Sequence, residues 1–84
     1  MTSPRSAILT DLQERLGRIA FVQPGEVAPG TRFREDLEID SLTAVALLIE
    51  LEDHYGIRVA DAEALGLETV ADAIALIEQK IAAP

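Results

Sequence analysis

Two Pro-Gly pairs, Pro24-Gly25 and Pro29-Gly30, constrain the fold most strongly, because neither pair suits the interior of a helix or a strand. They predict a loop that reaches from the end of a first helix to about residue 40. A loop of this length without regular structure is uncommon in a small protein and is usually functional. Its second half contains two apolar residues four positions apart, Phe33 and Leu37, which we expect to anchor the loop to the core.

A helix is predicted before the loop, from about Pro4 to Ile19. Ser3 and Pro4 form a typical start, a capping residue followed by proline at the first helical position. Apolar residues then recur at helical spacing, which predicts one buried face. The residues of this face are Ile8, Leu12, Leu16 and Ile19.

A second helix is predicted from Ser41 to about Tyr55, with Gly56 as its stop signal. Two apolar stripes run along it. The stripe expected to face the core consists of Leu47, Leu48, Leu51 and Tyr55. The other, which we call the outward stripe, consists of Leu42, Val45, Ala46 and Ile49. Because Glu50, Glu52 and Asp53 argue against full burial, we expect the outward stripe to await a partner.

The remainder of the chain predicts an extended link at 57–59, a single helical turn at 61–64 and a last helix. Thr69 caps this last helix, with Asp72 completing a capping box. Its expected core face consists of Val70, Ala73, Ile74, Ile77 and Ile81. The predicted fold is therefore all-α, a small antiparallel bundle of three long helices plus one short helix.

Length and charge limit the class of protein. Eighty-four residues predict a single domain, 1–84, and the absence of cysteine excludes disulfides and thiolate metal sites. A net charge of −8 argues against nucleic acid and anionic membranes as partners and favours proteins with basic patches. No apolar run approaches membrane-spanning length, and the first twenty residues lack the apolar segment of a signal peptide. We therefore expect a cytoplasmic protein without membrane insertion.

Ser41 stands out as a candidate for modification. Seven carboxylates and no Lys or Arg lie between residues 35 and 53, and Ser41 lies among them at the start of the second helix. A helix N-terminus supplies oriented N–H groups and partial positive charge, which would favour an anionic group on Ser41. Leu42, beside it, is placed for recognition by an enzyme that approaches Ser41. This pattern suits covalent modification and docking better than catalysis.

No catalytic site and no defined metal site are expected, and weak binding of divalent cations by the carboxylate cluster stays open as an alternative. The only histidine, His54, lies thirteen residues beyond Ser41 on the same helix. At 1.5 Å per residue the two are about 20 Å apart, so they cannot act as nucleophile and base, and we expect an exposed imidazole. A calcium loop beginning at Asp36 would need Gly and Glu where Ser41 and Leu47 stand.

Asp40-Ser41-Leu42, with the loop before it and the acidic helix after it, resembles the acyl carrier protein family over nearly the whole chain. The resemblance implies that Ser41 carries 4′-phosphopantetheine, moved there from coenzyme A by a phosphopantetheinyl transferase. Three residues depart from the family pattern, and one of them, Thr43, dilutes the acidic charge of the second helix. Glu38 stands where glycine is common, a change that we expect to be tolerated. Ala46 stands where fatty-acid carriers are often acidic, which makes the docking face more apolar.

The resemblance further implies a discrete, monomeric carrier that is not an enzyme. It would hold acyl groups as thioesters and deliver them to partners with basic docking patches: an acyltransferase or acyl ligase, a ketosynthase and other enzymes of fatty-acid or polyketide biosynthesis. The residues expected to dock these partners are Glu38, Leu42, Val45, Ala46, Ile49, Glu52 and Asp53. Two alternatives stay open at this point, a peptidyl or aminoacyl carrier and an unmodified helical interaction module. The sequence does not identify the cargo.

Overall fold

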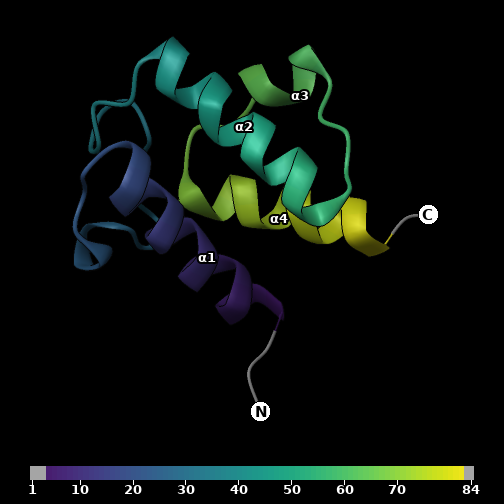
Figure 1. The fold of residues 1–84 in the computed structure, drawn as a ribbon, viewed down its shortest axis with the longest axis horizontal. Helices are drawn as coiled ribbons and strands as arrows, with labels where there is room; N and C mark the ends of the chain where they lie inside the picture. The colour runs from purple at the N-terminus through teal and green to yellow at the C-terminus, as the bar shows by residue number, and fades with distance from the viewer. Residues whose placement is uncertain (1–3, 83–84) are drawn as a thin grey trace.

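The computed structural model describes residues 4–82, which form four α-helices and one 3-10 turn (Figure 1). The elements are α1 (Pro4–Ile19), η1 (Pro24–Glu26), α2 (Ser41–Tyr55), α3 (Asp61–Leu65) and α4 (Val70–Ala82). The described part has no strand, and its single isolated bridge joins Arg32 to Thr69. The predicted all-α class is confirmed, whereas the predicted cap at Ser3 lies outside the described residues. Within that span no helix has both the length and the apolar character needed to cross a membrane.

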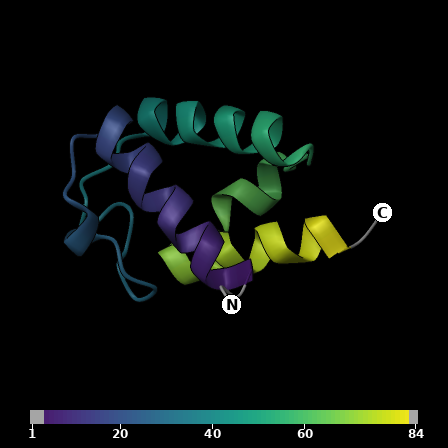
Figure 2. The same cartoon turned by 60° about the horizontal axis from the view of Figure 1, so that its bottom comes forward.

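The helices enclose one core. α2 forms the upper edge of the view in Figure 2 and α4 the lower edge, with α3 between them. α1 packs against both α2 and α4, and its chain direction opposes that of α2 in both views (Figures 1 and 2). Side chains from all three long helices therefore meet in the middle. The outer face of α2 is left without a neighbouring helix.

The predicted core faces are largely confirmed. The buried residues of the three long helices are Ile8, Leu12, Leu16, Leu47, Leu51, Val70, Ala73, Ile74 and Ile77. Ile19 and Tyr55 are half-buried against this cluster. The prediction for Ile81 is wrong, since this side chain is 53% exposed. The last turn of α4 projects beyond α1 (Figure 2), so α1 does not cover Ile81.

The loop between α1 and α2 is tied down along its length. Phe33 and Leu37 are half-buried against the core, as predicted, but Val27 and Ile39 are buried more deeply. Backbone hydrogen bonds join the loop to the start of α4: the N–H of Phe33 donates to the carbonyl of Glu68 at 3.0 Å, and further bonds run from α4 back to the loop. The loop that leads into α2 is therefore held against the core and the start of α4.

Polar contacts fix α2 against α1. Arg15 donates to Asp11 and to Glu50, at 2.8 Å in each case, and Arg18 also binds Glu50 at 2.8 Å. The hydroxyl of Tyr55 donates to Asp11 at 2.9 Å. Hydrogen bonds from Arg18 and Arg15 lower the pKa of Glu50, and burial followed by the contact with Asp11 raises the pKa of Tyr55 to about 12. These contacts agree with the orientation of α2 that buries Leu47 and Leu51 in the core.

Candidate functional site

Ser41 is the first residue of α2, and its side chain is exposed. The helix is capped by its neighbour, because a carboxylate oxygen of Asp40 accepts the N–H of Thr43 at 2.8 Å. The same hydrogen bond holds the pKa of Asp40 below its ordinary value. Among the described residues no hydrogen bond to the Ser41 hydroxyl is found. Because Asp40 caps the helix, the Ser41 hydroxyl is not needed as a cap.

The backbone immediately before Ser41 is rigidly placed. Ile39 is buried, and its N–H donates to the carbonyl of Phe33 at 3.0 Å. The N–H of Glu38 donates to the carbonyl of Arg34 at 3.1 Å. A buried anchor two residues before Ser41 explains how an exposed hydroxyl keeps a defined position.

Glu38 adopts a left-handed backbone conformation, with a φ of 53°. This conformation costs an L-residue roughly 1–2 kcal/mol and costs glycine almost nothing. Glycine at this position would adopt the same backbone conformation without this cost. The hydrogen bonds of Glu38 and Ile39 and the buried side chain of Ile39 hold the backbone in this conformation.

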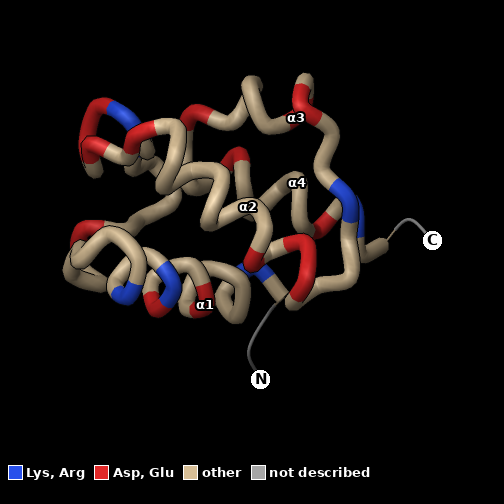
Figure 3. The backbone as a smooth tube through the Cα atoms, turned by 45° about the horizontal axis from the view of Figure 1, so that its top comes forward, with Lys and Arg blue, Asp and Glu red and all other residues tan. Residues whose placement is uncertain are grey.

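The outward stripe is exposed, as predicted. Leu42 is 80% exposed, Val45 52% and Ile49 59%, and Ala46 is exposed beside them. Residues 41–49 carry no charge, so this part of α2 is tan in Figure 3, between acidic residues at either end. An exposed apolar strip therefore begins next to Ser41.

The seven carboxylates between Glu35 and Asp53 fall into two groups. Four bind within the chain: Asp36 accepts the N–H of Arg32 at 2.8 Å, and Glu52 accepts the N–H of Val59 at 2.8 Å. The other two of the four are Asp40 and Glu50, described above. No hydrogen bond or ion pair within residues 4–82 involves the side chains of Glu35, Glu38 or Asp53. Carboxylates without a partner in the described residues thus lie at the two ends of the outward stripe. The carboxylate of Glu52 instead holds the backbone of Val59, a contact that the sequence did not predict.

The remaining polar groups of this face are His54 and the acidic side chains. His54 is exposed and stacks edge-to-face on Tyr55, with 4.7 Å between the ring centroids. Across the described part of the chain, no three acidic or histidine side chains come together as a metal site would require. The site consists of a free hydroxyl, an apolar strip and flanking acids.

Comparison with known proteins decides the family. The family model described as "Phosphopantetheine attachment site" matches residues 6–77. A meromycolate extension acyl carrier protein from Mycolicibacterium aurum is 35% identical over 79 residues, which cover 94% of this chain and 81% of that protein. The chain belongs to the acyl carrier protein family. It is accordingly a phosphopantetheine-dependent carrier of acyl groups.

Other acyl carrier proteins extend the comparison. One from Rhodococcus erythropolis is 34% identical over 79 residues, covering 94% of this chain and 87% of that protein. The crystal structure of an acyl carrier protein from Thermotoga maritima superposes with a TM-score of 0.83 at 23% identity, covering 94% of this chain and 92% of the other. At that identity the superposition speaks for the fold alone, and it confirms the predicted acyl-carrier-protein-like bundle.

Proposed function

We propose that Ser41 is the attachment site of the 4′-phosphopantetheine arm. The observation that carries this assignment is the exposed Ser41 hydroxyl at the start of α2, left free because Asp40 caps the helix. The matched span of the family model includes this residue. The positive end of the α2 dipole favours a phosphodiester at this point.

The residues around Ser41 fit such a group. The arm, when bound, supplies a thiol that holds an acyl group as a thioester. Ser41 contributes the oxygen that bonds to phosphorus, and Ile39 and Asp40 hold the backbone in place. His54 is about 20 Å away along the helix, so the transferase supplies the base that accepts the Ser41 proton. The carrier itself displays cargo and is not an enzyme.

Partner enzymes dock on the outward stripe and on the free carboxylates at its ends. The apolar contacts come from Leu42, Val45, Ala46 and Ile49, and the charged contacts from Glu38 and Asp53, with Glu52 in a minor part. The partners are a phosphopantetheinyl transferase, an acyltransferase or acyl ligase, and a ketosynthase, each with a basic patch. Charged contacts at the rim act mainly on association rate, whereas buried apolar contacts hold the complex together.

Fatty acyl groups of lipid biosynthesis are the proposed cargo. Relatives named for meromycolate extension support this choice over an aminoacyl group. We further propose that residues 1–84 act as one monomeric carrier domain.

The test uses the purified chain, coenzyme A and a broad-specificity phosphopantetheinyl transferase. Wild type should gain the mass of one arm, and so should Ser6→Ala, which removes an exposed serine of α1. Ser41→Ala should gain nothing. Loading of the modified protein with malonyl, fatty acyl and aminoacyl donors then separates the cargo classes, and preferential aminoacyl loading would reject the fatty acyl proposal.

A further inference from the structure

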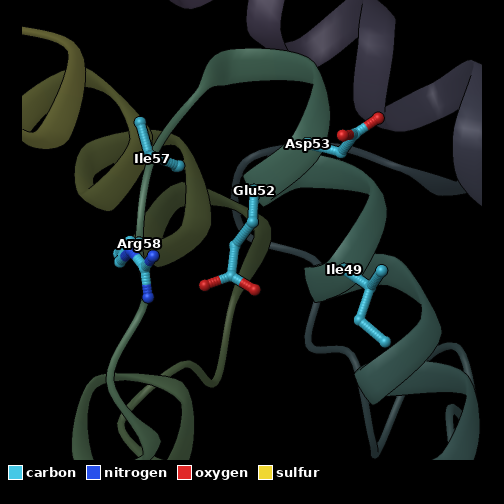
Figure 4. A pocket seen from close by; sticks show the side chains of 5 residues that line it. All are labelled: Ile49, Glu52, Asp53, Ile57 and Arg58. Atoms are coloured by element: carbon cyan, nitrogen blue, oxygen red, sulfur yellow. The ribbon is translucent and has the colours of Figure 1, made fainter.

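A depression of about 320 Å³ lies at the far end of α2 from Ser41 (Figure 4). Its lining residues are Ile49, Glu52, Asp53, Ile57 and Arg58. Ile49 also belongs to the outward stripe, so the depression continues the docking face. A partner that covers the whole stripe reaches it, since Ser41 and Asp53 are only about 18 Å apart along the helix, within the width of a standard interface.

Among the described residues, Arg58 is the one cation that lines this depression, and its side chain forms no ion pair there. Five of the seven Lys and Arg residues form ion pairs: Arg5, Arg15, Arg18, Arg32 and Lys80. Arg58 forms none with any group in residues 4–82, although two carboxylates line the same depression. Its side chain is exposed. In a chain of net charge −8, this cation is available to an outside partner.

The backbone on both sides of Arg58 is held by Glu52. The N–H of Ile57 donates to the carbonyl of Glu52 at 3.1 Å, and the N–H of Val59 donates to its carboxylate at 2.8 Å. Ile57 is buried as well. Figure 4 shows Glu52 between the link that carries Arg58 and the part of α2 that carries Ile49. Arg58 is thus presented from a fixed backbone, which lowers the entropy lost when a partner binds it.

We propose that Arg58 is a specificity-determining residue of the docking face, which binds a carboxylate of the partner enzyme beside an apolar contact to Ile49. The proposal rests on the docking function given above and adds the chemistry of the partner. The partner presents basic side chains to Glu38 and Asp53 but an Asp or Glu to Arg58. An enzyme whose patch is basic throughout is disfavoured, because it sets a cation against Arg58.

The test compares two substitutions that remove the same charge. Arg58→Gln removes the proposed contact, and Arg5→Gln removes a positive charge from α1, where Arg5 pairs with Glu78 on α4 at 3.4 Å. The probe is a broad-specificity phosphopantetheinyl transferase, and the readout is its Kd for the carrier at low ionic strength. The Ser41→Ala background is used so that docking is measured without transfer.

Arg58→Gln should raise the Kd about two- to fivefold, the range expected for an exposed ion pair, and Arg58→Lys should recover most of the loss. Arg5→Gln should leave the Kd unchanged or lower it, because the carrier becomes more acidic. A Kd for Arg58→Gln equal to or below that of the parent would overturn the proposal. Failure of wild type to gain the arm would instead refute the Ser41 assignment, since the binding measurement does not depend on transfer.

Discussion

Two apolar residues of α2, only two positions apart, should respond very differently to truncation. Leu51 is 2% exposed and lies in the core cluster, so Leu51→Ala should cost about 2–5 kcal/mol of unfolding free energy. Ile49 is 59% exposed. Since full burial of such a side chain contributes about 1.5–3 kcal/mol, the buried two-fifths of Ile49 contributes at most about 1 kcal/mol. The expected gap between the two variants is therefore about 1 kcal/mol or more.

Urea unfolding followed by circular dichroism measures this gap. With a slope of about 1 kcal/mol per molar urea for a small domain, the two midpoints should differ by about 1 M or more. If Leu51→Ala is unfolded without urea, Leu51→Val gives a smaller loss that can be measured, with Ile49→Val as its matched control. Equal midpoints for the Ile49 and Leu51 variants would mean that the outward stripe is buried, and the docking argument would then fail.

Three further predictions follow from the site and the packing. Glu38→Gly should raise the free energy of unfolding by about 0.5–1 kcal/mol in the same assay, because glycine removes the left-handed strain but loses more chain entropy on folding; a destabilised variant would refute the strain argument. Asp53→Lys should slow phosphopantetheinylation at low salt with a difference that shrinks as salt is added, whereas Val45→Asp should slow it at every salt concentration. The pKa of Tyr55 is raised from 10.0 in the unfolded chain to about 12 in the fold. The protonated hydroxyl therefore stabilises the fold fully below pH 10, and this contribution is lost as the pH rises toward 12. Absorbance titration of this single tyrosine checks the value, and Tyr55→Phe should weaken the alkaline loss of stability.

The sequence predicted the helices well because each carries its own boundary signals. Gly56 ends α2 with a φ of 65°, and Thr69 and Asp72 form the predicted capping box at α4, each side chain accepting the other's backbone N–H at 3.1 Å. These signals act within a few residues and depend little on tertiary packing. Ile81 follows the periodicity of α4 equally well, but burial also requires a neighbour, which periodicity does not reveal.

The candidate site was predicted in outline for a similar reason. The exposed stripe of α2 follows from periodicity and charge within one helix. The internal use of Glu50 and Glu52 depends on Arg15 and on the backbone of Val59, and these contacts form only when the chain folds. The strain at Glu38 likewise depends on buried Ile39 and on hydrogen bonds across the loop. The sequence did not single out Arg58. Its proposed role rests on the absence of an ion-pair partner among the described residues, and only the folded structure reveals this absence.

Peptide mapping of the modified protein tests the central assignment most directly. Trypsin cleavage after Arg34 and Arg58 releases the segment 35–58, which contains a single serine, Ser41. After reaction with coenzyme A and the transferase, this peptide should carry the whole mass of the arm, and its fragment ions should place the arm on Ser41 rather than on Thr43. An arm found on Thr43, on Ser6 or on any other peptide would contradict the account.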